Sequence, residues 1–126
     1  MIRLRRALEP QLDAVHSRTW YEDAPNDAEY PYLVYNFPND LDDGEGFCNV
    51  VLDIDGWDAP EAGDTTALEN LMAAVDAAIN KKTLIADDIV VTFYRNNKLS
   101  LDDDDERIKR RKYIYQARLF DLKGVE

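Results

Sequence analysis

Residues 48–80 decide the fold, and they read CNVVLDIDGWDAPEAGDTTALENLMAAVDAAIN. Three apolar residues recur at every second position of the first part of this stretch: Val50, Leu52 and Ile54. Asp53 lies between Leu52 and Ile54, and Asp55 follows Ile54. Because successive side chains of a strand point to opposite faces of a sheet, this alternation predicts a strand over 48–57 with one buried face and one solvated face.

The second part of the stretch predicts a helix over 66–80. Apolar residues recur at spacings of three and four on one face: Leu68, Leu71, Met72, Val75 and Ile79. We expect Leu71, near the middle of that face, to be deeply buried, and Glu69 and Asp76 to face away from the core. Thr66, followed three residues later by Glu69, is typical of the capping box that begins a helix.

The flanking segments predict a second helix and further strands. A narrow apolar stripe predicts a helix before His16, and Pro10 should begin this helix, kink it or confine it to one side. Segments rich in aromatic and β-branched residues predict four more strands, over 17–21, 32–35, 89–94 and 112–120. We expect turns at 38–46 and at Asn96-Asn97.

These elements together predict the fold class α+β. We expect one domain spanning residues 1–126, because a single hydrophobic core commonly serves about 100–150 residues. Its sheet should contain about four to five strands, mostly antiparallel or mixed, with the two main helices packed on one face.

The charge of the chain limits its partners. There are 26 acidic residues and 15 Lys or Arg residues, which give a formal net charge of −11. Such a charge opposes a general attraction to nucleic acid. A basic run over 107–112 nevertheless follows directly after the acidic run 102–105. Adjacent blocks of opposite sign suggest complementary contacts between subunits as readily as a ligand site.

The cysteine count and the hydropathy pattern indicate a reducing compartment. Cys48 is the one cysteine, so an internal disulfide is excluded. No apolar run approaches the length of a signal peptide core or a membrane span. We therefore expect the protein to be cytoplasmic when it is made and to have no membrane partner.

Few residues could carry catalysis. We expect His16 to be a helix-end residue and Cys48 to be a buried, inert thiol, and not a base and a nucleophile. Asp53, Asp55 and Asp58 leave a metal-dependent nuclease or hydrolase open as an alternative, because clustered carboxylates hold Mg²⁺ in such enzymes. The simpler interpretation is a solvated strand face. We accordingly expect no catalytic residue, no metal site and no cofactor.

Two other motifs also have simpler interpretations. The segment 39–44 is similar to a calcium loop, but Leu41 and Val50 then fall at ligand positions, so we interpret it as an acidic turn. The run 110–115 mixes basic and aromatic residues, as modules that bind single-stranded nucleic acid do. Its alternation continues to Leu119, which favours a strand whose tyrosines pack in the core.

Several segments, taken in order, resemble one protein family. They are Ala24-Pro25, 32–36, 52–58, 64–69, 93–96 and 110–118. Together they are similar to the tail-terminator (tail completion) family of long-tailed bacteriophages and prophages, over nearly the whole chain. The acidic segment 40–46 has no counterpart in this resemblance.

The resemblance implies an α+β subunit that has no catalytic residues. Such subunits form a homo-oligomeric ring, typically a hexamer, on the head-proximal end of the tail tube. The ring stops tube polymerisation and docks head-completion proteins. The implied partners are the major tail tube protein and a head-completion or connector protein, with DNA only passing through the lumen. The implied location is the virion, and the host cytoplasm before assembly. Another head-tail connector or neck component is the alternative within virion assembly.

The opposite charge blocks suggest which residues make the contacts in such a ring, because blocks on identical subunits can pair head to tail. The candidate subunit-interface residues are Asp102, Asp103, Asp104, Asp105, Arg110, Arg111 and Lys112.

Overall fold

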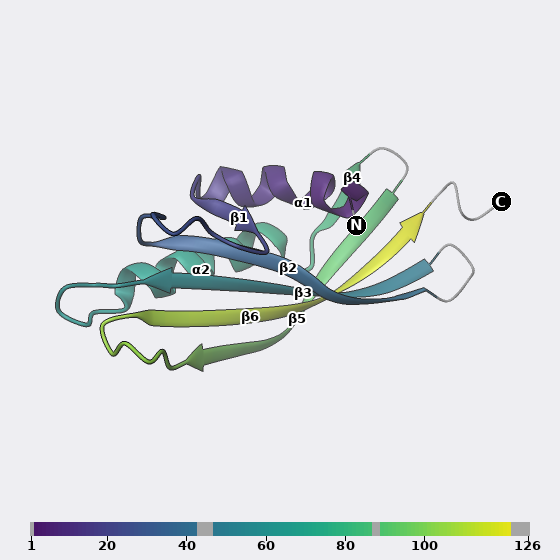
Figure 1. Ribbon diagram of the computed structural model, residues 1–126. Helices are drawn as coiled ribbons and strands as arrows, with labels where there is room; N and C mark the ends of the chain where they lie inside the picture. Colours follow the sequence, from purple (N-terminus) through teal and green to yellow (C-terminus); the bar gives the residue numbers. More distant parts are fainter. Residues whose placement is uncertain (1, 43–46, 87–88, 122–126) are drawn as a thin grey trace.

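The computed structural model describes residues 2–42, 47–86 and 89–121, and Figure 1 shows how their elements are arranged. In chain order the elements are α1 (Ile2–Val15), β1 (Thr19–Tyr21), β2 (Tyr32–Asp42), β3 (Phe47–Asp58), α2 (Thr66–Ile79), β4 (Thr83–Ala86), β5 (Ile89–Leu101) and β6 (Lys109–Asp121). Within these three ranges, no helix is long and apolar enough to cross a membrane.

The six strands form one sheet in the order β1-β2-β3-β6-β5-β4. β1 pairs with β2 in parallel, and the remaining neighbours pair antiparallel. Both helices lie on one side of this sheet, and we call the uncovered side the open face (Figure 1). The α+β class, the mixed sheet and the pair of helices on one face are confirmed. The sheet has six strands, where the sequence predicted four to five.

The core lies between the helices and the sheet, and alternate residues of each long strand fill it. On β6, Tyr113 and Tyr115 are buried under the helices, whereas Ile114 and Gln116 point to the open face. This alternation confirms that 110–115 is a strand whose tyrosines pack in the core. The same period places the predicted apolar residues of β3 in the core: Val50, Leu52 and Ile54.

The centre of the sheet is a continuous ladder, in which β3 pairs with β6 over all 12 of its residues without a register shift. The flanking strands are interrupted. β2 shifts its register between Asn36 and Asn39, and β5 shifts between Arg95 and Asn97. The turn predicted over 38–46 is therefore wrong for 38–42, which belong to β2, while residues 43–46 lie outside the described residues. The turn predicted at Asn96-Asn97 is wrong. A bulge accommodates a residue without an N–H, such as proline, so the strand continues through it.

Two further element boundaries differ from the expectation, because Pro10 neither begins the first helix nor confines it to one side, and one strand was not predicted. α1 runs through Pro10 on both sides, with Leu4, Leu8 and Leu12 buried on its inner face. The packing of these leucines outweighs the hydrogen bond that a proline removes from a helix. The sequence also missed β4, which has only four residues and follows α2 after three connecting residues.

α2 confirms the predicted helix and its start at Thr66, but the contact that holds the first turn differs from the prediction. The side chain of Asp64, and not a capping box, holds the first turn, because its Oδ1 accepts from the Thr66 N–H at 2.9 Å and from the Thr66 hydroxyl at 2.6 Å. Leu71 is only half-buried, against our expectation. Asp76 faces the sheet, where we expected it to face away. The fully buried side chains of α2 are Leu68, Met72, Val75 and Ile79.

Candidate assembly surface

One end of the sheet carries the acidic loop that the sequence singled out. Residues 102–108 connect β5 to β6, next to the segment 59–65 that leads into α2. Asp105 binds Arg107 through two hydrogen bonds of 3.0 and 2.8 Å, and this pairing lowers the pKa of Asp105 to about 2. The negative charge of Asp105 is thus balanced by Arg107 within its own loop, while Asp102 and Asp104 are exposed.

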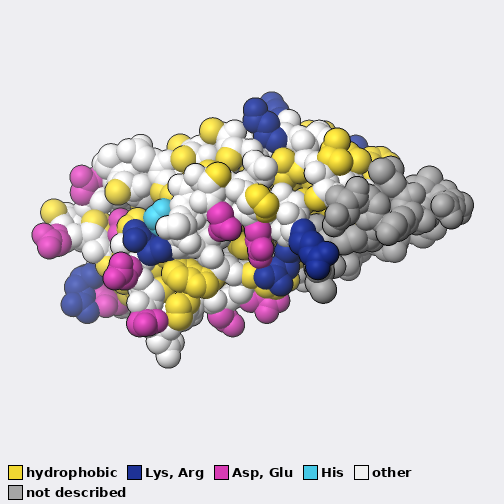
Figure 2. Space-filling view, turned by 90° about the horizontal axis from the view of Figure 1, so that it is seen from above, with side chains coloured by type: hydrophobic (Ala, Val, Ile, Leu, Met, Phe, Trp, Pro, Cys, Tyr) yellow, Lys and Arg dark blue, Asp and Glu magenta, His cyan; other side chains and the backbone are white. Residues whose placement is uncertain are grey.

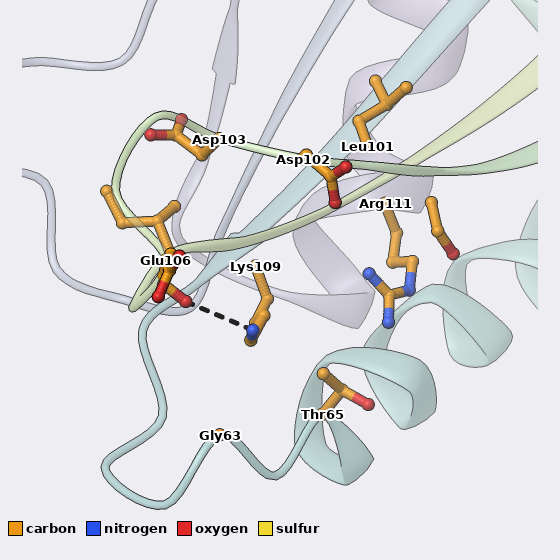
Figure 3. Close-up of a pocket in the computed structure, with 10 residues that line it drawn as sticks. Gly63, Thr65, Leu101, Asp102, Asp103, Glu106, Lys109 and Arg111 are labelled. Carbon is orange, nitrogen blue, oxygen red and sulfur yellow. Dashed lines mark hydrogen bonds between the residues drawn. The ribbon is translucent and has the colours of Figure 1, made fainter.

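A hollow of about 740 Å³ lies between this loop and the first turn of α2. Figure 3 shows the residues that line it. Asp102 and Asp103 line it from the loop, and Arg111 points into it from β6. The Lys109 ammonium donates to the backbone carbonyl of Glu106 at 3.2 Å. The fold therefore brings two of the predicted acidic interface residues and one of the predicted basic residues to the same hollow.

The predicted basic interface residues each have an acidic partner in the same chain. Arg110 Nε donates to Asp55 Oδ1 at 3.1 Å, and Lys112 Nζ lies 3.6 Å from Asp53 Oδ2. Arg111 pairs with a glutamate at the start of α2. These pairs hold β6 to β3 and to α2, so the basic run has a role in the fold of the subunit itself.

The same ion pairs bear on whether Asp53, Asp55 and Asp58 could form the metal site of a nuclease or hydrolase. Asp53 and Asp55 point to the open face and are held by Lys112 and Arg110, whereas Asp58 lies on the helix side and accepts from the Ala59 N–H at 2.8 Å. Burial raises the pKa of Asp55, and Arg110 opposes that rise. Across the described residues, no group of three or more His, Cys, Asp and Glu side chains could hold a metal. The three carboxylates are therefore occupied and do not converge.

The two residues considered as base and nucleophile lie apart in the chain. His16 follows the last residue of α1, as predicted, and its Nε2 lies 2.8 Å from the Pro31 carbonyl oxygen. The Cys48 side chain lies outside the described part of the structure, as does most of the acidic segment 40–46.

An aromatic cluster on the open face was missed by sequence reasoning. Tyr32 stacks on Trp57 with ring centroids 6.2 Å apart, and Tyr30 stacks on Tyr32 at 5.3 Å. The Arg110 guanidinium lies over the Trp57 ring at 4.6 Å, which is cation–π geometry. The cluster depends on the register that pairs Tyr32 with Trp57 and Trp57 with Arg110. Hydropathy along the sequence contains no signal of that register.

Seen from the helix side, the surface mixes charged and hydrophobic side chains, with acidic and basic groups interspersed (Figure 2). The geometry thus offers charged loops and aromatic surface, and three of its carboxylates, Asp53, Asp55 and Asp105, are paired with cations. Such a surface suits contacts between proteins.

Comparison with known proteins identifies the family. Residues 3–119 match the family model described as Tail completion protein gp17. The chain belongs to the tail completion protein family. This match confirms the resemblance that the sequence showed, and it makes the chain a structural component of phage tail assembly.

Two solved structures share the fold of this family member. A chain of the structure described as "Virion of native gene transfer agent (GTA) particle" matches with a TM-score of 0.72 and 14% sequence identity, over 93% of this chain and 94% of that chain. A second solved structure matches with a TM-score of 0.67 and 11% identity, over 94% of this chain and 91% of that one. Among curated proteins, none matches.

Proposed function

We propose that this tail completion protein is a tail terminator. It forms a ring, expected to be a hexamer, on the head-proximal end of the tail tube in the virion. The ring ends tube polymerisation and docks a head-completion or connector protein, while DNA only passes through its lumen. The family match over residues 3–119 carries this proposal.

The net charge sets the conditions under which copies assemble. A subunit with a formal charge of −11 repels its copies, so free protein should be a monomer or small oligomer at micromolar concentration. Raised salt screens that repulsion and favours association. The tube end favours it further, because neighbouring subunits bound there are at a high effective concentration. A ring that closes only on a finished tube does not cap prematurely.

Within this proposal the acidic loop 102–105 is the part of the predicted interface best placed to meet a partner. Asp102 and Asp104 are exposed at the end of the sheet, so their carboxylates are accessible to a basic group. The basic residues of the predicted interface are already paired with carboxylates of their own chain, so their charge is balanced; they are Arg110, Arg111 and Lys112. Reversing the sign of the loop changes the interface without breaking those pairs.

The experiment combines purified tail tubes with the free protein. Electron microscopy should show the protein at one end of each tube, and light scattering should show association that increases with concentration and salt. A double variant, Asp102→Lys with Asp104→Lys, should reduce tube-end occupancy while its thermal unfolding matches the wild type. A protein that stays monomeric at every concentration and never occupies a tube end would end the tail-terminator proposal.

The alternative within assembly is another head-tail connector or neck component. Both roles use rings of small subunits, and the family description does not say which end of the tail is completed. Purified heads separate the two. A neck component should bind DNA-filled heads that lack tails, whereas a tail terminator should bind tubes that lack heads.

A further inference from the structure

α2 has an outward face that is unusual for a surface helix. A helix at the surface normally presents charged or polar residues to water, and a helix that is apolar all round is normally buried. One exposed residue of α2, Glu69, is charged, and it is bound by Arg111. The middle of the outward face consists of small uncharged residues, which we call the alanine face: Asn70, Ala73, Ala74 and Ala77.

The open face of the sheet, on the other side of the molecule, exposes several large apolar side chains. Ile85 of β4 is 74% exposed, Phe120 of β6 is 47% exposed, and Tyr94 of β5 is 43% exposed. Ile85 pairs across to Val90, and Val90 pairs across to Phe120, so an apolar row crosses three neighbouring strands. Tyr30, on the aromatic cluster, is also exposed on this side. Exposed apolar patches of this kind mark sites of protein contact.

Charge distinguishes the open face from the rest of the subunit. Its strands carry two described carboxylates and three described cations, which are Asp53, Asp55, Arg110, Lys112 and Arg118, and Glu22 and Asp23 border it next to Arg110 and Lys112. Most of the net charge of −11 therefore belongs to other residues of the chain. Copies that approach through this face avoid most of the repulsion that their total charge creates.

From these two surfaces we infer that the open face of one copy packs on the alanine face of the next copy. The inference rests on the proposed ring, and it names the surfaces that join its subunits. Small side chains allow a helix to approach a sheet closely, and the exposed Ile85 and Tyr94 then gain burial. The nearly balanced charge of the open face suits an uncharged helix, since Asp53 and Asp55 already have cation partners in their own chain.

A second copy is the occupant because the two surfaces lie on different sides of the same chain. α2 covers the helix side of the sheet, and the open face is the side it leaves uncovered (Figure 1). A contact between two different patches of identical subunits is head to tail, and it generates a ring when the rotation closes. A patch that met itself would give only a two-fold dimer.

The test uses one variant for each surface. Ala74→Glu places a carboxylate on the alanine face, and Tyr94→Asp places one on the open face. Glutamate and alanine are both good helix formers, so the first change should not disturb α2. Each variant should raise the concentration needed for association, measured by light scattering, at least about tenfold. Ala14→Glu is the matched control, because Ala14 is an exposed alanine on α1, and this variant should associate like the wild type.

Mixing the two variants tests the head-to-tail geometry. The Ala74→Glu copy keeps a good open face and the Tyr94→Asp copy keeps a good alanine face. An equal mixture at high concentration should therefore form heterodimers that cannot extend, while each variant alone stays monomeric. Where free wild type is monomeric throughout, occupancy of tube ends replaces light scattering for the three single variants. Tyr94→Thr, which suits a strand better, repeats the sheet-side test if Tyr94→Asp has a lowered melting temperature.

The outcomes separate this inference from the proposed function. Wild type that caps tubes, together with surface variants that cap equally well, would overturn the inference and leave the tail terminator standing. A mixture with no heterodimer would also overturn it. Wild type that neither associates nor binds tubes would overturn both.

Discussion

The hydroxyl of Tyr115 donates to Asp76 Oδ1 at 2.8 Å and so ties the centre of β6 to α2. Arg95, from β5, binds the other oxygen of the same carboxylate at 2.6 Å. α1 has an equivalent arrangement, in which Tyr35 of β2 donates to Glu9 Oε1 at 2.6 Å. Each helix is thus fixed to the sheet by one carboxylate that accepts from a buried tyrosine.

Tyr115→Phe should lower the free energy of unfolding by about 1–3 kcal/mol, because Asp76 then loses a donor in a partly buried place. Urea unfolding monitored by circular dichroism measures this change. Tyr94→Phe is the control, since Tyr94 is 43% exposed, and it should change stability little. Equal effects of the two changes would show that the hydroxyl of Tyr115 contributes nothing.

Alkaline pH should destabilise the fold through its buried tyrosines. Burial raises the pKa of Tyr35 and Tyr115 well above the ordinary value of 10.0. The unfolded chain therefore releases protons near pH 10 while the folded chain keeps them, so this stability is complete below about pH 10 and is lost as pH rises further. Each tyrosine contributes a slope of up to about 1.4 kcal/mol per pH unit.

Urea titrations between pH 8 and pH 11 measure this dependence. The double variant Tyr35→Phe with Tyr115→Phe should show a flatter decline than the wild type, although its stability at pH 8 is lower. A decline that is equally steep in both proteins would assign the alkaline transition to other groups, such as Tyr21 and Tyr32, whose pKa values are also raised.

The packing of α2 is tested by comparing two neighbouring residues. Met72 is fully buried, and Met72→Ala should cost about 2–5 kcal/mol of stability because it leaves a cavity. Leu71 is only half-buried, so Leu71→Ala should cost clearly less. Thermal melting of the two variants decides which residue lies at the centre of the contact. A larger loss of stability in Leu71→Ala than in Met72→Ala would show that the helix face centred on Leu71, as predicted from the sequence, packs on the core.

Gly56 of β3 lies directly under Met72. A Cβ atom at position 56 would come within 2.6 Å of Met72 Sδ and 3.0 Å of Leu68 Cδ1. Gly56→Ala should therefore destabilise the protein by about 1–3 kcal/mol through overpacking. In a Met72→Ala background the same change should cost less, because the cavity receives the new methyl group. Additive losses in the double variant would contradict this contact.

The double variant Asp53→Asn with Asp55→Asn tests the absence of an enzyme. We expect neither the wild type nor this variant to show nuclease or phosphatase activity with Mg²⁺ or Mn²⁺. The variant should be less stable, because Arg110 and Lys112 lose their partners. Reproducible turnover by the wild type that vanishes in the variant would refute a purely structural role.

The features that could be predicted from the sequence are those set by local periodicity. The alternation around Leu52 and the apolar stripe of α2 each follow from a short window of residues, and both elements are where they were predicted. The boundaries that failed depend on pairing. Whether Pro38 ends a strand or lies in a bulge is decided by the neighbouring strand, and the sequence near it contains no record of that neighbour.

The candidate surface was only partly predictable for the same reason. The acidic and basic runs could be recognised from the sequence, but the residues with which they form ion pairs could not. Arg110 meets Asp55 across the sheet because β6 pairs with β3 in one register. A shift of one residue would turn Arg110 toward the helices. The exposed row through Ile85 and Phe120 also appears only after three strands are aligned.

The uninterrupted β3–β6 ladder has a mechanical consequence. Twelve paired residues at about 3.4 Å each span about 40 Å, which makes this pair a strut through the length of the subunit. Force applied along it is shared by the whole row of hydrogen bonds. The bulges in β2 and β5 give the flanking strands places to bend around that strut. β3 and β6 thus resist deformation along the molecule, whereas β2 and β5 allow the sheet to bend across it.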